Sequence, residues 1–406
     1  MEGSLYPSCT LDAIFGSENV YSQRISPTVC TWLPLSEVQK DMMTGGAIAI
    51  AGSMPYICST AVSNPAALQL LMAAGLPVSE KHLLRFCDSD DYVRLVRKQC
   101  GSGKTVAAQY LHGESELPTA NCCIQPSVLS FLNNKANMSA LVDGEYLPRR
   151  TVLPSAKLVD FVTSQALPFV VKVATDEPTG AGLDVVICES LSDSKRAEDV
   201  FRSCRTVIVE EFLPISRNLC LNYTIAQSGA ITFLGCAEQV SDAQGIYQGN
   251  WLGKDISAPA EAVAIGERIA RAGFTMGYYG FLGIDMAVLD DDRIKVFDLN
   301  FRINGSTAPL LLAESVMQRF ARPLIRLERF AGRATYRDML DIAYRELAKG
   351  TLVPLSSFDP DAVGCSASQP RLIAMLLGNT KDDIDEYKRE LAATGLMKAT
   401  YQKEQS

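Results

Sequence analysis

The chain has 406 residues, of which 47% are hydrophobic and 21% charged, a composition typical of globular domains in water. This length accommodates two or three domains, each with its own core. The formal net charge of -8 argues against a broad surface for nucleic acids, and residues 1–10 lack the basic and apolar regions of a secretory signal.

The longest apolar stretch, residues 45–58, is too short and too rich in glycine to span a bilayer. We therefore expect a cytoplasmic protein with small-molecule partners and with neither a membrane nor a nucleic acid as partner. The 12 cysteines show no Cys-x-x-Cys spacing, and the only histidines are His82 and His112, which argues against a zinc site. Reduced thiols are the simplest account of these cysteines.

The first part of the chain, up to about residue 133, has the pattern of an α/β unit. Asn64 is placed to cap a short apolar helix that ends at Gly75. The expected elements are a buried strand (47–53), two helices (65–74 and 88–98) and two strand-like runs (105–111 and 122–124).

Residues 101–105, GSGKT, look like the end of a phosphate-binding P-loop. That motif needs a glycine where Lys98 stands, and it needs a strand before the loop and a helix after it. Here a helix precedes the loop and a β-rich run follows it, so a helix-to-strand turn is favoured.

From residue 134 the pattern changes. Asn134 can cap a helix over residues 135–142. Residues 167–173, LPFVVKV, are a buried β-run interrupted by Lys172, and a charge in such a run needs a partner, which a nucleotide phosphate would supply. A glycine loop with Gly180 and Gly182 precedes a second strand at 183–188, and the N–H groups of such a loop can cover phosphates.

Residues 206–214, TVIVEEFLP, read as a strand that ends in two acids, an aromatic residue and a proline, which makes a natural hinge between domains. The following elements are a hairpin (219–226 and 231–237) with Glu238 at its end, a loop rich in glycine and tyrosine (245–253) that could close over a site, and a helix (261–272).

The strands 281–289 and 294–299 are joined by an acidic turn. Asp298, Asn300 and Arg302 alternate and so share one face, and Asp285 lies beside them if the hairpin is in register. Two carboxylates and an amide oxygen suit Mg²⁺, and Arg302 adds a cation for anionic groups. Taken alone, a strand pair with solvated charges on its outer face is the simpler explanation.

The order of these motifs over residues 134–312 resembles the ATP-grasp superfamily of carboxylate–amine ligases, in particular L-amino acid (dipeptide) ligases of natural-product biosynthesis. The motifs are Lys135, Lys172 before the glycine loop, the VEEFL hinge, and Asp285 followed by Asp298-x-Asn300-x-Arg302. The resemblance implies an α/β fold of α+β lobes in four parts: an N-terminal domain (1–133), a lid (134–212), a lobe with the metal site (213–330) and a small α/β extension (331–406) that covers the substrate pocket or forms a dimer.

The resemblance also implies ATP as cofactor, with one or two Mg²⁺ ions and Mn²⁺ as the alternative metal. Its residues for the phosphates and the base are Lys135, Lys172, Gly180, Gly182, Glu210, Glu211, Phe212 and Leu213. Asn218 would replace the glutamate that often binds the ribose. Asp285, Asp298 and Asn300 would hold the metal, Arg302 and Lys172 would be catalytic, and Glu238, Asn304, Gly305 and Ser306 would lie near the substrates.

The implied activity is an ADP-forming ligase that joins an amino acid, or another small carboxylic acid, to an amine through an acylphosphate. The resemblance favours a pathway that makes antimetabolite peptides. A ligase of a cofactor or primary-metabolic pathway, and an ATP-binding protein without catalysis, remain as alternatives. Beyond residue 312 we expect a helix (314–330), a strand and turn (350–360), a strand (371–377) and a helix (382–393).

Overall fold

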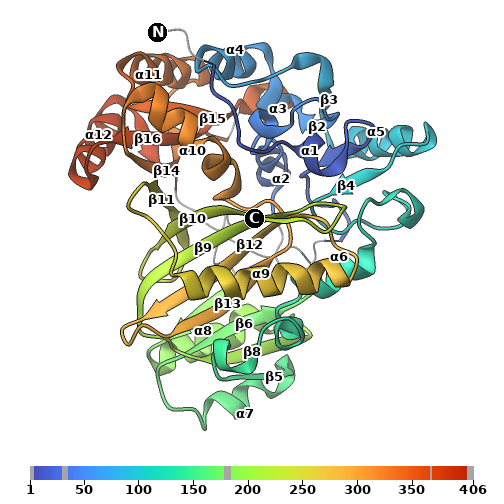
Figure 1. The fold of residues 1–406 in the computed structure, drawn as a ribbon, viewed down its shortest axis with the longest axis vertical. Helices are drawn as coiled ribbons and strands as arrows, with labels where there is room; N and C mark the ends of the chain where they lie inside the picture. The colour runs from blue at the N-terminus through green and yellow to red at the C-terminus, as the bar shows by residue number, and fades with distance from the viewer. Residues whose placement is uncertain (1–3, 30–34, 178–183, 366–367, 400–406) are drawn as a thin grey trace.

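The computed structural model describes residues 4–29, 35–177, 184–365 and 368–399, and within these ranges the strands form three sheets. In the view of Figure 1 the N-terminal region lies at the upper right, the long central sheet runs from the upper left through the middle, and a small four-stranded sheet lies at the bottom. No helix in the described ranges is both long enough and apolar enough to cross a membrane.

The N-terminal region is a parallel sheet of order β3-β2-β1-β4 with helices around it. Its helix α4 begins after Asn64, whose side chain accepts from the Ala67 N–H, as predicted. The strands are β1 (Val20–Ser22), β2 (Tyr56–Ser59), β3 (Leu83–Phe86) and β4 (Val106–Ala108). The helices are α1 (Leu11–Phe15), α2 (Glu37–Met43), η1 (Ile48–Ile50), α3 (Thr60–Ser63), α4 (Pro65–Ala73), η2 (Glu80–His82), α5 (Ser89–Gly101), η3 (Thr119–Asn121) and α6 (Pro126–Asn133).

Two strand predictions for this region are wrong, and the interpretation of the GSGKT run is confirmed. The run at 47–53 is a buried 3₁₀ turn, because a short apolar run does not by itself distinguish a strand from another buried segment. Residues 122–124 contribute a single bridge, between Val106 and Cys122. The GSGKT run is indeed a helix-to-strand turn, since α5 ends at Gly101 and β4 follows.

The four-stranded antiparallel sheet, which we call the lid, has the order β5-β8-β6-β7 and a core of its own. Its strands are β5 (Arg150–Pro154), β6 (Phe169–Ala174), β7 (Val185–Cys188) and β8 (Thr206–Glu211), with α7 (Leu158–Val162) and α8 (Leu191–Phe201) packed on them. The helix predicted at 135–142 is instead a 3₁₀ helix, η4 (Lys135–Ala140), capped by Asn134 as expected. Two further 3₁₀ turns, η5 (Gly144–Tyr146) and η6 (Ser155–Lys157), precede α7.

The central sheet follows the path β13-β12-β9-β10-β11-β14-β16-β15, and β17 pairs with β14. Its strands are β9 (Ile215–Ile225), β10 (Ile231–Ser241), β11 (Tyr247–Gly253), β12 (Gly280–Leu289), β13 (Ile294–Asn300), β14 (Leu324–Gly332), β15 (Leu352–Phe358), β16 (Arg371–Gly378) and β17 (Leu396–Lys398). The helices beside it are α9 (Ala260–Thr275), α10 (Thr307–Phe320), α11 (Tyr336–Lys349), η7 (Pro360–Val363) and α12 (Lys381–Thr394).

Two predictions fail in this sheet. The residues expected to form a closing loop at 245–253 are mostly the strand β11. The helix expected at 314–330 ends at Phe320, where Ala321 takes a left-handed conformation, and the chain returns as β14. The four-part division of the chain stays a prediction, although β14 lies in one sheet with strands on both sides of residue 330.

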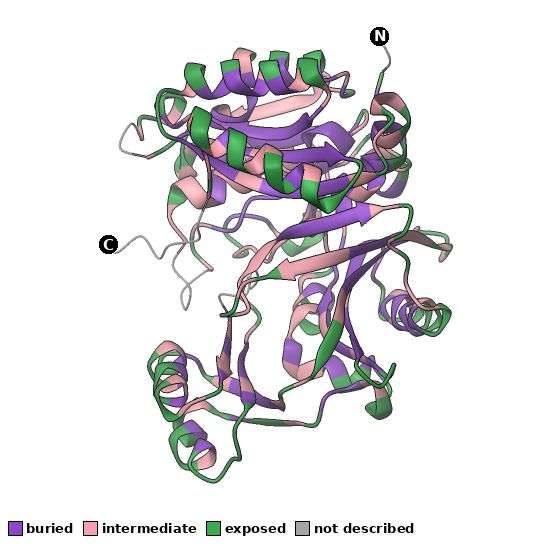
Figure 2. Cartoon of the chain, turned by 90° about the vertical axis from the view of Figure 1, so that its left-hand side faces the viewer, coloured by how far each residue is buried: buried purple, intermediate pink, exposed green. Residues whose placement is uncertain are grey.

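The two faces of the central sheet pack against different partners. Side chains such as Leu252, Leu327 and Met375 pack with α10 and the N-terminal region, and we call this the inner face. The opposite, outer face packs against α9 through residues such as Ile284 and against α11 and α12 through residues such as Leu376. Figure 2 shows the resulting distribution, with buried residues along the strands and exposed residues on the outer sides of the helices.

Candidate active site

Two carboxylates lie side by side on β12 and β13. Asp285 and Asp298 are paired across the hairpin, which confirms the register that the sequence predicted, and Asn300 lies two residues beyond Asp298. Burial, followed by the nearby charge of Asp298, raises the pKa of Asp285 to about 7. Such a pair disfavours two negative charges unless a cation is present.

Lys135 is one cation at this pair. Its ammonium is hydrogen-bonded to Asp298 and lies 3.4 Å from Asp184 Oδ2, at the start of the lid strand β7. Burial disfavours the charged form of Asp298, but the attraction of the Lys135 ammonium is stronger than this effect, so the pKa of Asp298 is lowered. Arg150 Nη2 donates to the Lys135 carbonyl at 2.6 Å, so η4 connects the lid to β13.

Lys172 is a second cation between the lid and the central sheet. Its Nζ lies 2.6 Å from Glu210 Oε2 and donates to the Phe297 carbonyl of β13 at 3.0 Å. Lys172 is 6% exposed and Glu210 3%, so both are buried. Arg150 Nε lies 3.6 Å from Glu210 Oε1, and that oxygen accepts no hydrogen bond.

Within the described part of the chain, the hinge residues Glu211, Phe212 and Leu213 form no hydrogen bond or ion pair with Lys172. Because neighbours on a strand point to opposite faces, the Glu211 side chain turns away from Lys172 and pairs with Arg149 at 2.8 Å. The ring of Phe212 is 38% exposed, and Leu213 is half-buried. Gly180 and Gly182 lie outside the described residues.

Asn218, predicted near the ribose, lies on β9 opposite Ala287 of β12. It alternates with Cys220 on the inner face, and its Oδ1 is buried without a hydrogen-bond partner. A buried acceptor of this kind is rare in folded proteins and is a candidate for a ligand hydroxyl.

Arg302 lies at the start of the loop that follows β13. Its Nη1 donates to Asn133 Oδ1 at 2.9 Å, and its guanidinium lies over the Tyr110 ring at 5.7 Å. Asn133 also accepts from the Phe301 N–H at 3.0 Å, so the end of α6 fixes the backbone and side chain of this turn. Sequence reasoning missed Asn133 and Tyr110, since both lie far from Arg302 along the chain.

The next residues, Asn304 to Ser306, form a tight turn on the inner face. Asn304 Oδ1 accepts from the Ser306 N–H at 2.9 Å and from Ser306 Oγ at 2.8 Å. Asn222 of β9 donates to Ser306 Oγ at 3.2 Å. A Cβ added to Gly305 would lie 2.9 Å from Tyr247 Oη of β11, so this turn runs across β9 towards β11.

The structure corrects one predicted position. Glu238 was expected near the substrates, yet its carboxylate points to the outer face, 3.8 Å from Lys381 of α12. The next residue, Gln239, faces inward and donates to Asp285 Oδ1 at 2.9 Å. A register shift in β10 between Phe233 and Gly235 decides which neighbour faces the site, and nothing in the sequence pattern marks it.

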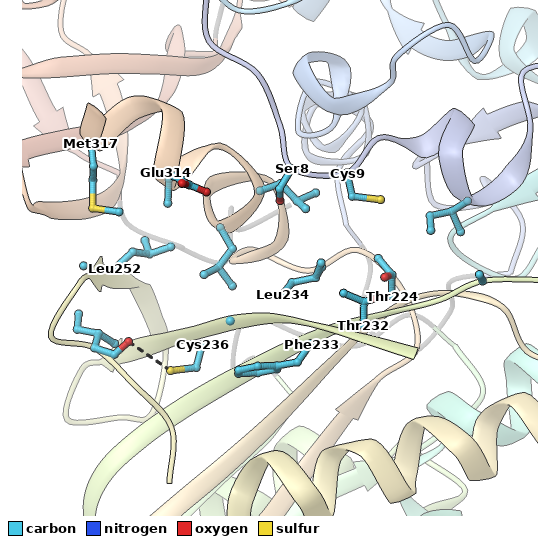
Figure 3. A pocket seen from close by; sticks show the side chains of 18 of the residues that line it. Ser8, Cys9, Thr224, Thr232, Phe233, Leu234, Cys236, Leu252, Glu314 and Met317 are labelled. Carbon is cyan, nitrogen blue, oxygen red and sulfur yellow. Dashed lines mark hydrogen bonds between the residues drawn. The ribbon is translucent and has the colours of Figure 1, made fainter. Parts of the chain in front are cut away.

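A cavity of about 580 Å³ lies between α10, residues 8 and 9, and the strands β9, β10 and β11 (Figure 3). Its lining is largely apolar, with Leu234, Leu252 and Met317 among its walls and Glu314 at α10. None of the predicted site residues lines it, so it is separate from the carboxylate pair.

Two family models match the N-terminal region and most of the segment from the lid to β13. Residues 10–130 match the N-terminal domain of L-aspartate–L-methionine ligase, and residues 148–300 match the ATP-grasp domain of the same ligase. The chain belongs to the ATP-grasp ligases. The predicted superfamily, fold and class of ATP-dependent carboxylate–amine ligase are thereby confirmed.

Solved structures support the ATP-grasp fold. An ADP complex of the N5-carboxyaminoimidazole ribonucleotide synthetase purK has 14% identity and a TM-score of 0.58, covering 83% of this chain and 89% of that one. The Aspergillus clavatus N5-carboxyaminoimidazole synthase with ADP and 5-aminoimidazole ribonucleotide has 13% identity and a TM-score of 0.58, covering 94% and 99%. The L-amino acid ligase from Bacillus licheniformis has 13% identity and a TM-score of 0.50, covering 79% and 89%.

Proposed function

We propose that this ATP-grasp ligase joins the carboxyl group of L-aspartate to the amino group of L-methionine, the pair named by the matching family. The observation that carries the proposal is the carboxylate pair Asp285–Asp298 with two buried lysines nearby. Both matched regions of the chain belong to the family that carries this pair of substrates in its name. A role in the synthesis of antimetabolite peptides and a homodimeric state stay predictions.

ATP would lie between the lid and the central sheet. Lys135 and Lys172 contact carboxylates and a carbonyl of the protein, and phosphate oxygens would exchange with these partners. Glu210 Oε1, which accepts no hydrogen bond, suits the amino group of a base, and Asn218 Oδ1, which also accepts none, suits a ribose hydroxyl. The hinge backbone at Phe212 and Leu213 would contact the base, as the resemblance implies.

Asp285, Asp298 and Asn300 would hold Mg²⁺. The donor set fits this cation, because hard oxygen ligands from two paired carboxylates and an amide lie on one face. The raised pKa of Asp285 has a related origin, since burial and the neighbouring Asp298 outweigh the attraction of Lys135 and Arg302. When bound, Mg²⁺ would supply positive charge that neutralises the charge on the transferred phosphoryl group.

The reaction needs no nucleophilic side chain. An oxygen of the aspartate carboxylate attacks the γ-phosphorus, and the bond to the bridging oxygen of ADP breaks. The methionine amine then attacks the acyl carbon, the acyl carbon–oxygen bond breaks, and inorganic phosphate and a proton leave. The contribution of Arg302 and the lysines is to position the reactants and to stabilise charge in the transition state.

The test is a matrix of amino acid pairs with ATP and Mg²⁺, in which phosphate release is measured and the products are identified by mass spectrometry. We expect ADP, phosphate and aspartyl-methionine, and turnover only when both amino acids are present. Release of AMP and pyrophosphate would contradict the acylphosphate route. Turnover with another pair and none with aspartate and methionine would contradict the substrate assignment.

A further inference from the structure

A second polar group of side chains lies on the inner face of the central sheet, on the strands beyond the metal pair. We call Tyr247, Asn250, Arg329 and Arg371 the C-terminal patch. Two of these residues lie on β14 and β16, beyond residue 300, where the matches to the family models end. Resting on the proposed function, we propose that Arg329 and Arg371 bind the substrate carboxylates that are not joined in the reaction.

Strand pairing places both arginines on the inner face. Trp251 pairs with Arg326, which lies over the Trp251 ring on the outer face, so Arg329, three residues on, points inward. Arg329 pairs with Ile373, which packs against the inner-face core. Arg371 is two residues from Ile373 and so shares its face. Diagonal neighbours of this kind lie roughly 7–8 Å apart, close enough for both guanidinium groups to reach one small ligand.

The patch is connected to the turn at Asn304 to Ser306. The Arg329 guanidinium lies over the Tyr247 ring, 4.9 Å from its centroid. Tyr247 Oη accepts from Asn250 Nδ2 at 2.7 Å and lies against Gly305. Asn250 pairs with Gln239, the residue that contacts Asp285, so a row of inner-face side chains runs from the metal pair to the patch.

Asn250 itself indicates a ligand. It is 1% exposed, and its Oδ1 is buried without a hydrogen-bond partner. A buried amide oxygen without a donor costs roughly 1–3 kcal/mol, so such groups are uncommon without a function. The ammonium group of an amino acid is a donor that would satisfy this oxygen.

The spacing suits a dipeptide. Four strand steps separate β12 from β14 along the sheet, or roughly 19 Å at about 4.8 Å each. An extended dipeptide spans roughly 7 Å, and the transferred phosphate at one end and an arginine side chain at the other would take up the remaining length.

The charges of the substrates require such a patch. Aspartate and methionine carry three carboxylates, of which one is activated near Arg302. The other two would lose water on binding, and a desolvated carboxylate needs a hydrogen-bonded cation. Arginine is suited to this, since its planar group binds a carboxylate through two parallel hydrogen bonds.

The experiment compares each free carboxylate with its amide. The wild-type enzyme is assayed with aspartate or asparagine, and with methionine or methioninamide, in steady-state kinetics of phosphate release. The same ratios of kcat/KM are measured for Arg329→Met and Arg371→Met. Arg389→Met is the matched control, because Arg389 is exposed on α12. Binding of ADP and thermal unfolding report whether the fold and the nucleotide site are intact.

We expect Arg329→Met and Arg371→Met each to reduce at least one carboxylate-to-amide ratio by at least about thirtyfold, as removal of one member of a desolvated charge pair does. Arg329→Lys should recover part of the ratio, because it keeps the charge and loses the paired geometry. Wild-type ratios for both substrates in both variants would overturn the proposal. If a different amino acid pair reacts, the aspartate–methionine assignment fails, and the ratios for that pair still test the arginines.

Discussion

The ion pair between Lys172 and Glu210 allows a quantitative test of how the lid is held. Replacing Lys172 with methionine keeps most of the side-chain volume and removes the ammonium. Glu210 would then retain only Arg150, whose Nε lies 3.6 Å from Oε1, and the hydrogen bond to the Phe297 carbonyl would be lost. Removing one partner of a buried pair costs about 3–5 kcal/mol, and with Arg150 remaining we expect about 2–3 kcal/mol for Lys172→Met.

The second substitution, Glu210→Gln, makes the prediction specific. The double variant no longer leaves the Glu210 carboxylate without Lys172, so part of the loss should be regained, with a coupling energy of about 1–3 kcal/mol, although Arg150 then loses its carboxylate partner. Hydrogen exchange of the amides in β6 and β8 measures the local opening free energy of the lid directly. Lys195→Met, at an exposed position on α8 of the same lid, is the control and should change this free energy little.

Two results would refute this reasoning. If the free-energy changes of the two substitutions simply add, the pair is not coupled as its 2.6 Å contact requires. If Lys172→Met turns over ATP at the wild-type rate, Lys172 does not contact the phosphates. We expect both the single lysine variant and the double variant to lose turnover, because the lost phosphate contact does not depend on the stability of the lid.

Three further predictions concern other parts of the molecule. Arg302→Lys should keep the fold and lower kcat/KM for phosphate release by at least about a hundredfold, since one lost oxyanion donor has that effect; a wild-type value would remove Arg302 from the site. Gly249→Ala should lower the free energy of unfolding by about 1–3 kcal/mol or more. Its φ of +109° is strained for alanine, and the new Cβ would lie 2.0 Å from the Leu327 carbonyl oxygen. Gly144→Ala, where nothing lies within 4 Å, is its control, and equal melting temperatures would contradict the argument. Burial disfavours the charged form of Glu37, but the contacts with Lys40, Ser89 and Arg24 are stronger and lower the pKa of Glu37 from 4.5 to about 2. The contribution of Glu37 to stability is therefore complete above about pH 4.5 and is lost as the pH falls towards 2. Melting curves across this range should show a smaller pH dependence for Glu37→Gln than for the wild type.

The sequence predicted the parts of the site that depend on local geometry. A short acidic turn joins the two strands, which brings Asp285 and Asp298 into one hairpin, and a register shift between Asp285 and Met286 sets their direct pairing. Lys172 was identified because a charge in an apolar β-run needs a partner. Asn134 and Asn64 were identified as caps because their side chains precede helical patterns.

The remaining parts depend on contacts between distant segments. Gln239 rather than Glu238 reaches Asp285 because of a register shift that leaves no mark in the alternation of β10. Asn133 contacts Arg302 only because α6 lies beside β13. The run at 245–253 became a strand because β10 and β14 supply hydrogen-bond partners on both sides, which outweighs its glycines.

The unbroken path of the central sheet has a consequence for the engineering of this enzyme. The strands that bear the carboxylate pair and those that bear the C-terminal patch belong to one hydrogen-bonded plate. A chain cut near residue 331 would strip β16 from β14 and leave an apolar edge with Ile325 and Phe330 open to self-association. The residues after 331 therefore cannot be removed without opening this edge. Point substitutions on the inner face keep this hydrogen-bonded path and are the better route to a change of substrate.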